Sequence, residues 1–390
     1  MFRSRIAPDS AGILFVLARQ FRILVIGGYG NFGSRICRAL GCSPGIQVIV
    51  AGRNLRCSTD FVNTLPPECQ AEPCQLDHTA ACLSEQLEKL DANLVIHTSG
   101  PFQGQDFHVA EACIKAKVHY VDLADARDFV VNFQKLHDRA VGADLLLVSG
   151  ASTLPGITSV VVNALTSGLQ QILGIRVGIA PAQKNPRGIG TVKSVLSYCG
   201  KPFLTLVDGE WKQVFGWQDI QCFDYPEIGK RWGGCCDVPD VELMPQIYPE
   251  LKTVQFHAAL GSAVVQWGLW ILAYLVRLRI IRDPVRMAPL LKRWSDKLNV
   301  FGDETGAMFV QINGRKHGGD TVVRTWRIIA HRNHGSEIPC IPAIILGRKL
   351  ARGELSRRGA TACLNLFSTD DFQYAVSDFA ISTSVSEGTI

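Results

Sequence analysis

The chain has 390 residues, more than one hydrophobic core usually supports, so we expect two domains. Hydrophobic residues make up 47% and charged residues 19%, a balance that is typical of a folded protein and excludes global disorder. The formal net charge of +5 is small for this length, and no block of five or more Lys/Arg occurs, so nucleic acid is not an indicated partner.

Thirteen cysteines are scattered along the chain without a Cys-x-x-Cys pair. Their odd number and irregular spacing favour reduced thiols in a cytoplasmic protein, mostly buried as small apolar side chains. The adjacent Cys235 and Cys236 cannot both reach one ion in a standard finger geometry, so we predict no metal site.

Residues 1–21 precede the first predicted strand and hold three arginines around a short apolar run over 11–18. The run is too short for a secretory signal, and Asp9 counts against an Arg-rich organelle presequence. We therefore expect a loose N-terminal extension.

From residue 22 to 150, strand-like and helix-like segments alternate. Apolar runs predict strands over 22–28, 47–53, 69–76 (the weakest), 92–100, 118–124 and 144–150. Helical spacing appears over 34–42, about 106–116 and about 127–141. This alternation predicts the α/β class, with a parallel, doubly wound sheet at residues 22–150.

The glycine-rich segment GGYGNFG lies between the first strand and the first helix. Gly28, Gly30 and Gly33 have the spacing of the dinucleotide fingerprint: one glycine for the turn, one for approach of a pyrophosphate, and one for close helix packing. The alternative is a glycine-rich turn without a ligand. The residues between the glycines belong to the same predicted phosphate loop: Tyr29, Asn31 and Phe32.

The end of the second strand indicates which dinucleotide binds. A carboxylate about 20 residues beyond the loop would mark NAD, but the segment AGRN places Arg53 there. A guanidinium suits the 2′-phosphate of NADP, with Arg56 as a candidate helper. The alternative is an exposed arginine on a turn.

Further candidates lie at the ends of the fourth and fifth strands, the edge where open α/β sheets bind ligands. Gly100 and Pro101 form a rigid turn that we expect beside the nicotinamide. Asp122, Asp125 and Arg127 are candidates for orienting a substrate. Helix capping and a surface ion pair remain the alternative for these three residues.

Residues 258–276 carry no charge and are followed by three arginines. By length this segment could cross a bilayer, but it contains Gln266 and small residues, and a helix that is apolar all round can equally be buried in a core or subunit interface. We favour burial and keep membrane contact as the alternative.

Several segments together resemble the saccharopine dehydrogenase-like family of NADP-binding oxidoreductases: GGYGNFGSRICRAL, AGRN, VIHTSGPFQGQDFHVAEACIKAKVHYVDLAD and SGASTLPGITS. The resemblance is clearest over 22–160 and continues more loosely through segments similar to bacterial members, such as PRGIGTVKSVLSYCGKP and IPAIILGRKLARGELSRRGA.

The resemblance implies an N-terminal Rossmann domain (22–150) and a second α+β domain (151–375) for substrate and dimerisation, with 341–360 packing back on the Rossmann domain. It implies NADP as cofactor, with the three glycines at the pyrophosphate, Arg53 at the 2′-phosphate, Gly100 and Pro101 at the nicotinamide, and Asp77 near the adenine. Arg187 is a candidate for holding a substrate carboxylate. We expect the tail over 376–390, rich in Ser and Thr, to be disordered.

The expected function is hydride transfer between NADP and a C=N group (saccharopine-like) or an activated C=C group of a small molecule. His97 and Tyr120 have proton-donor chemistry but lie in apolar strands, so no catalytic residue is assigned. The tryptophans Trp211, Trp217 and Trp232 suit either an apolar substrate or a plain core. The competing hypothesis is a non-catalytic NADP-binding protein associated with membrane or lipid. Surplus sheet in the second domain also suggests a homodimer.

Overall fold

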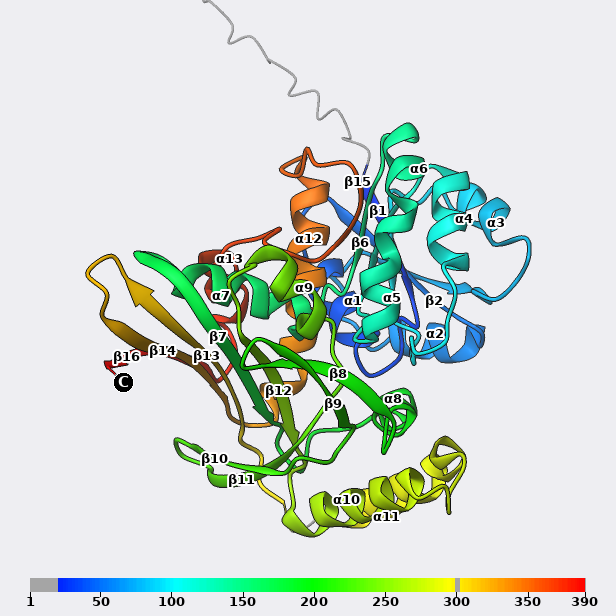
Figure 1. Ribbon diagram of the computed structural model, residues 1–390. Coiled ribbons are helices and arrows are strands. Elements are labelled where there is room, and N and C mark those ends of the chain that lie inside the picture. Colours follow the sequence, from blue (N-terminus) through cyan, green and yellow to red (C-terminus); the bar gives the residue numbers. More distant parts are fainter. Residues whose placement is uncertain (1–19, 299–301, 390) are drawn as a thin grey trace, which may run out of the picture.

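The structure is a computed structural model that describes residues 20–298 and 302–389. The first 19 residues of the predicted N-terminal extension lie outside this range, and Phe21 already begins the first strand. Two sheets organise the chain, one in the upper right and one in the lower left of Figure 1.

The N-terminal sheet has seven strands in the order β15-β6-β5-β4-β1-β2-β3, and the pairs along it are parallel. Its strands are β1 (Phe21–Ile26), β2 (Ile46–Gly52), β3 (Ala71–Gln75), β4 (Leu94–His97), β5 (His119–Asp122), β6 (Leu146–Ser149) and β15 (Gly359–Ala362). The predicted α/β class and the doubly wound parallel sheet are confirmed.

Helices cover both faces of this sheet, so its strands are apolar on both sides. In β1, Ile23 and Val25 join the core on one face, and Leu24 and Ile26 join the core on the other. The helices are α1 (Gly33–Gly41), α2 (Leu55–Val62), α3 (Leu83–Lys89), α4 (His108–Ala116), α5 (Arg127–Asn132), the short η1 (Phe133–Leu136) and α6 (His137–Gly142).

The C-terminal part of the chain returns to this sheet. Helix α12 (Ile341–Ala351) packs against α1, where Gly347 faces Leu40 and Ile23 so closely that an added Cβ would lie 3.3 Å from Leu40. Strand β15 then pairs with β6 and forms one edge of the sheet. No sequence pattern predicted this seventh strand, because it has four residues and joins the sheet from a distant part of the chain.

The second sheet has nine strands and is mixed. Only β7 and β12 pair in parallel among its named strands, and β13, β14 and β16 continue it antiparallel. Its strands are β7 (Leu169–Ala180), β8 (Pro202–Val207), β9 (Glu210–Phe215), β10 (Gln221–Tyr225), β11 (Gly229–Cys235), β12 (Thr253–Ala259), β13 (Gly306–Lys316), β14 (Thr321–Ala330) and β16 (Ile381–Thr389).

The remaining helices flank this sheet or connect it to the first domain. They are the π-turn η2 (Thr153–Ile157), α7 (Thr158–Leu165), α8 (Ile189–Ser197), α9 (Asp240–Ile247), α10 (Ala263–Arg277), η3 (Pro284–Met287), α11 (Ala288–Leu298), η5 (His334–Ser336), η6 (Ile338–Cys340) and α13 (Thr369–Val376). Helix α7 packs on β13 and β14, and α9 packs on β12 and on α5 of the first domain.

The prediction of a disordered tail over 376–390 is wrong for the described residues. Residues Ile381–Thr389 form β16, which pairs with β14 along Val322–Ala330. An exposed edge strand has unpaired backbone groups, and the tail satisfies them at β14. Ser and Thr suit an edge strand whose side chains face solvent, so a polar composition did not imply disorder here.

Two of the cysteines that were expected to be reduced form a disulfide between Cys42 and Cys69. Cys42 follows the last residue of α1, and Cys69 lies just before β3, with the two Cα atoms 4.3 Å apart. The backbones meet there, since the N–H of Gln70 donates to the carbonyl of Gly41. This proximity across 27 residues is a product of strand pairing and cannot be read from cysteine spacing.

The apolar segment 258–276 is divided between two elements, because Ala258 and Ala259 end β12 and the helix begins at Ala263. Within the described residues no helix is both long enough and apolar enough to cross a bilayer. The expected burial is also wrong for one face: α10 buries Gln266, Leu269, Leu272 and Ala273, whereas the large apolar side chains of its outer face are exposed: Val264, Trp267, Ile271 and Tyr274.

Candidate active site

A cavity of about 790 Å³ lies between the two domains, where the carboxyl ends of β1, β4 and β5 face the second sheet. Open α/β sheets bind ligands at this edge. The second domain closes the cavity with the end of β7, the start of β13, the end of β14 and the start of α8. The lining residues therefore come from distant parts of the chain, from Ile26 to Pro339.

The glycine loop forms the first wall of the cavity. An added Cβ on Gly33 would lie 2.1 Å from the carbonyl oxygen of Gly27, so only glycine lets α1 begin this close to the strand. Gly27 and Gly30 line the cavity, and the N–H of Gly30 donates to Gly27 at 2.8 Å. This cradle at a helix N-terminus fits a pyrophosphate, which needs close backbone approach and free N–H groups.

The tight turn was assigned to Gly28, but the structure places it at Gly27, which has φ +78°. Gly28 is required for another reason, because an added Cβ would lie 2.9 Å from both the carbonyl of Val25 and the side chain of Val50. Gly27 was missed because it stands before the three-glycine pattern, although the double glycine was a visible signal.

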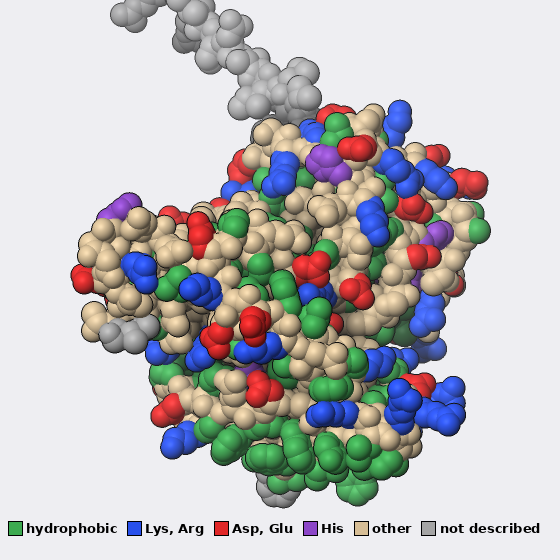
Figure 2. Space-filling model, viewed as in Figure 1, with side chains coloured by type: hydrophobic (Ala, Val, Ile, Leu, Met, Phe, Trp, Pro, Cys, Tyr) green, Lys and Arg blue, Asp and Glu red, His purple; other side chains and the backbone are tan. Residues whose placement is uncertain are grey.

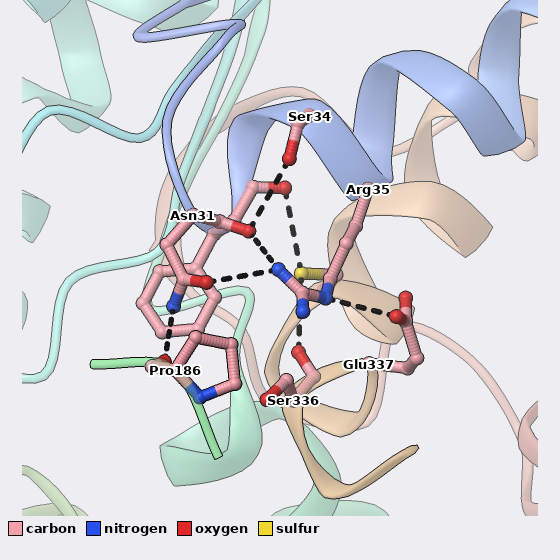
Figure 3. Close-up of polar contacts among 8 residues, drawn as sticks. Asn31, Ser34, Arg35, Pro186, Ser336 and Glu337 are labelled. Atoms are coloured by element: carbon pink, nitrogen blue, oxygen red, sulfur yellow. Dashed lines mark hydrogen bonds and ion pairs between the residues drawn. The ribbon is translucent and has the colours of Figure 1, made fainter. Parts of the chain in front are cut away.

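A polar network fixes the middle of the loop (Figure 3). The guanidinium of Arg35 donates to the backbone and the side-chain oxygens of Asn31 and, at 2.8 Å, to Glu337. The side-chain amide of Asn31 donates in turn to the carbonyl of Pro186 at 3.2 Å. The loop is thus tied to two segments of the second domain, while Asn31 and its neighbour Phe32 still line the cavity.

Tyr29 and Arg53 lie where the adenosine half of a dinucleotide would extend. The ring of Tyr29 covers Gly52, where an added Cβ would lie 2.4 Å from it, and its hydroxyl accepts from the N–H of Asn54. Arg53 is exposed, lines the cavity and has no ion pair among the described residues. Arg56 is 90% exposed and pairs weakly with Asp60 at 3.9 Å.

Asp77 does not line the cavity, although its neighbours Leu76 and His78 do. Its carboxylate accepts from the N–H of Thr79 at 3.0 Å and from the hydroxyl at 2.8 Å. These hydrogen bonds, the backbone one first, lower the pKa of the Asp77 carboxyl. The carboxylate therefore stabilises the turn after β3 instead of facing a ligand.

The Gly100–Pro101 turn lines the cavity directly opposite the second domain. Thr98 fixes its start by donating to the carbonyl of Ile26 at 2.8 Å, and the amide of Gln105 fixes its end by donating to Pro101 at 2.7 Å. Helix α8 presses against it, since an added Cβ on Gly190 would lie 3.3 Å from the oxygen of Gly100.

Asp125 is the carboxylate that lines the cavity. It accepts from the amide of Gln103 at 3.1 Å and from the hydroxyl of Ser194 at 3.1 Å. Its side chain is open to the cavity yet closely surrounded by protein; burial raises the pKa of the Asp125 carboxyl, and the two hydrogen bonds partly oppose this. Gln103 and Ser194 come from different domains and were not predicted.

The other three substrate candidates do not reach the cavity. Asp122 is fully buried and accepts from Ala124, Ser149 and Gly150, so it holds the end of β5 to β6; burial raises its pKa to about 6. Its position at a strand end was right, but its side chain points into the protein.

Arg127 of the first domain contacts three residues of the second domain. Its guanidinium donates to Glu242 at 2.8 Å, to Asp237 at 3.2 Å and to the carbonyl of Leu204 at 2.8 Å. Arg187, in the loop that precedes α8, donates to the hydroxyl of Ser295 in α11 at 3.3 Å. Burial lowers the pKa of the Arg187 guanidinium. Neither arginine is among the residues that line the main cavity.

The side chains with proton-donor chemistry in β4 and β5 are buried core residues. His97 pairs with the hydroxyl of Tyr120 at 3.2 Å, and burial lowers the pKa of His97 to about 3, so the ring stays neutral. Trp217 is also buried, and Trp211 and Trp232 are exposed away from the cavity. The tryptophans therefore do not form a substrate pocket.

The second domain contributes an apolar wall. Its apolar lining residues include Ile179, Pro181, Met308, Ile328 and Ile338. The polar lining residues of the same domain are Ser152, Thr153, Asn185, Thr191 and Ser194, and the buried side-chain oxygen of Asn185 has no hydrogen-bond partner among the described residues. Among the described residues that line the cavity, the Lys or Arg side chain is that of Arg53, in the first domain. The described lining residues of the second domain include no Lys or Arg.

The comparisons with known proteins agree with this geometry. Residues 23–146 match the family model described as saccharopine dehydrogenase NADP binding domain. The sequence matches no curated protein. The fold is similar to that of saccharopine dehydrogenase (L-Glu forming) from Saccharomyces cerevisiae in its apo form, with a TM-score of 0.64 and 16% identity over 94% of this chain and 99% of that chain.

Two other solved structures are similar at a lower level. The amine dehydrogenase from Mycobacterium smegmatis has a TM-score of 0.49 and 9% identity over 88% of this chain and 94% of that one. Biliverdin reductase from Synechocystis, in complex with biliverdin and NADP+, has a TM-score of 0.40 and 11% identity over 92% and 96%. Both are too distant to bear on the function of this chain.

The yeast enzyme, at 16% identity, shows the fold alone. The family match covers the glycine loop, Arg53 and the Gly100–Pro101 turn, and it supports a nicotinamide cofactor at the cavity. The resemblance inferred from the sequence is confirmed: residues 23–146 match the saccharopine dehydrogenase NADP-binding domain, and the fold of the chain is similar to that of a saccharopine dehydrogenase.

Proposed function

We propose that the protein is an NADP-dependent oxidoreductase that transfers a hydride to a C=N or activated C=C group of a predominantly apolar small molecule. The observation that carries the proposal is that the glycine loop, Asp125 and the apolar wall all line one cavity. A dinucleotide-binding edge that opens directly onto a pocket is the arrangement that hydride transfer requires.

The preference for NADP rests on Arg53. Arg53 lines the cavity directly after β2 and forms no ion pair with a carboxylate among the described residues. A 2′-phosphate would gain a charge-assisted hydrogen bond there, whereas the ribose hydroxyls of NAD would lack the carboxylate that usually accepts from them.

The substrate preference rests on the second domain. A substrate with several carboxylates needs basic side chains, and the lining of the described second domain offers none. Apolar groups such as Ile179, Met308 and Ile328 instead bury an apolar substrate, which favours affinity in proportion to the area removed from water. The amide of Asn185 is the candidate for orienting a polar end of that substrate.

Asp125 is the candidate group for proton handling. The bound nicotinamide would supply the hydride, and the product nitrogen or carbon would then need a proton. Asp125 lies in the cavity with a raised pKa and is held by Gln103 and Ser194, so the carboxyl is oriented and able to carry a proton to the reacting atom. Helix α8 presses against the Gly100–Pro101 turn and helps to exclude water.

The decisive experiment combines binding with turnover. NADPH and NADH are titrated against the full chain, and NADPH consumption is then followed with apolar imines, 2-oxo acids plus amines, and enoyl thioesters. We expect tight NADPH binding and turnover of an apolar substrate that depends on Asp125. NADPH binding without turnover of any substrate would favour the hypothesis of a non-catalytic NADP-binding protein. Absence of NADPH binding would contradict the proposed function.

A further inference from the structure

The helices α10 and α11 present an apolar surface that neither sheet covers. Figure 2 shows hydrophobic side chains gathered along the lower edge of the molecule, where Figure 1 places both helices. We call this the α10–α11 surface and define its apolar part as Val264, Trp267, Ile271, Tyr274, Leu278, Ile280, Leu290 and Trp294, all exposed.

On α10 the exposed apolar residues form one continuous stripe. Val264, Trp267, Ile271, Tyr274 and Leu278 follow each other at alternating steps of three and four, which places them on one side of the helix. Val264 is 75% exposed and Ile271 is 54% exposed, so the stripe faces away from the protein. Single exposed apolar side chains are ordinary, but a stripe of this length indicates a surface that is covered in use.

Aromatic rings pack against one another along part of the stripe. Trp267 packs against Trp232 with ring centroids 5.8 Å apart and against Trp270 at 5.9 Å, and Trp270 stacks on Tyr274. Trp and Tyr are favoured where an apolar phase meets water, because their rings are apolar and their N–H or O–H groups remain polar.

The charge of the same segment identifies its partner. Residues 263–298 contain seven basic and two acidic side chains, so they carry the whole formal net charge of +5, and the rest of the chain is balanced. Asp283 and Asp296 pair with Arg286 and Lys292. Three exposed arginines have no ion pair among the described residues: Arg279, Arg282 and Arg293.

We infer that the α10–α11 surface binds peripherally to an anionic lipid membrane, with its apolar stripe in the interface and its arginines at the head groups. An exposed apolar face with Trp and Tyr, combined with a basic rim, is the pattern of interfacial helices. A second copy of this chain is the weaker candidate, because it would bring two segments of charge +5 together. The inference does not depend on the proposed reaction.

The surface also adjoins the cavity. Helix α11 packs against α8, whose residues Ile189 and Ser194 line the cavity, and Arg187 before α8 donates to Ser295 of α11. A membrane-bound orientation would therefore place the cavity wall near the source of apolar molecules.

The test is vesicle flotation of the full chain with phosphatidylcholine vesicles and with vesicles that also contain phosphatidylglycerol. We expect binding to the anionic vesicles that weakens as salt rises. The double variant Trp267→Glu/Ile271→Glu should bind at least about 10-fold more weakly, because both side chains leave the interface. Arg279→Glu/Arg282→Glu should lose about 10-fold or more on anionic vesicles only.

Matched controls are Val385→Glu, which alters an exposed apolar residue on β16, and Lys115→Glu/Lys252→Glu, which alter exposed cations elsewhere. Both should bind like the parent chain, and thermal unfolding of all variants should match it. The inference is overturned if no vesicles bind, if charge and control variants weaken binding equally, or if ultracentrifugation shows an oligomer that Trp267→Glu/Ile271→Glu dissociates. That last result would make the stripe a subunit interface.

Discussion

The two halves of the cavity are built on different physical principles. The dinucleotide half depends on backbone proximity, since at Gly33 and Gly28 there is no space for a Cβ, and the glycines of its loop lie within one short stretch of chain. The substrate half depends on side chains gathered from distant segments, such as Ile179, Met308 and Ile338. The comparison teaches that a motif can identify a cofactor without indicating the substrate.

Filling the backbone cradle should have the largest effect. Gly33→Ala places a Cβ 2.1 Å from a carbonyl oxygen that cannot move without displacing β1 and α1. We expect a loss of at least about 3 kcal/mol in stability or an NADPH affinity at least about 100-fold weaker, since backbone overlap costs more than ordinary overpacking. Fluorescence titration and thermal unfolding measure both.

The matched control is Gly142→Ala, because Gly142 ends α6 with nothing within 4 Å of an added Cβ. It should be neutral in both measurements. Unchanged NADPH binding in Gly33→Ala would show that the loop tolerates expansion and is not a phosphate cradle.

Removing the proton-handling group should come next. Asp125→Asn keeps the shape and an oxygen that can accept from Gln103, but its amide cannot donate a carboxyl proton. We expect kcat to fall about 100-fold or more with an unchanged NADPH affinity. Asp128→Asn, an exposed change in the first turn of α5 three residues away, is the control and should retain activity.

The pH dependence sharpens this assignment. Because the pKa of Asp125 is raised, the protonated form persists to higher pH than for an ordinary aspartate, and the reduction rate should fall as pH rises through that raised pKa. Asp125→Asn should remove this limb of the profile. A rise in KM with kcat unchanged would instead assign Asp125 to substrate binding.

Changing cofactor selectivity should have an intermediate effect. Arg53→Ala removes a charge-assisted contact and should narrow the ratio of NADPH to NADH affinity by about 10-fold or more. Arg56→Ala should change the ratio less, because that guanidinium is 90% exposed and lies beyond the cavity lining. Equal losses of both cofactors in Arg53→Ala would contradict recognition of the 2′-phosphate.

The smallest effect should come from removing the ion pairs that Arg127 forms between the two domains. Arg127→Ala leaves Asp237 and Glu242 without their shared cation at a partly buried site, so we expect about 1–2 kcal/mol lower stability. Turnover of a neutral substrate should be nearly unchanged, as measured by denaturant unfolding and by the NADPH assay. A large rise in the KM of Arg127→Ala for the substrate, with unchanged stability, would instead indicate that Arg127 binds substrate.

The strands of the first domain were predictable because each is a short apolar run, and parallel sheets covered on both faces require such runs. The weak third segment also formed a strand, at Ala71–Gln75. β15 was not predictable, because four small residues acquire strand structure only by pairing with β6.

The roles of the polar candidates show the same limit. Asp122 and Asp125 are three residues apart at one strand end, yet one is buried under β6 and the other lines the cavity. Spacing along the chain placed both at the sheet edge but did not determine which side chain points outward. The partners that distinguish them, Ser149 and Ser194, come from distant segments.

The sequence by itself determined the parallel sheet, the glycine loop and the cation at the end of β2, since all three follow from local periodicity and spacing. Only the tertiary structure decided that Arg127 joins the domains, that the tail completes the second sheet, and that α10 exposes an apolar stripe. The physical reason is that backbone geometry is encoded within a few residues, whereas the burial of a side chain depends on what the rest of the chain brings against it.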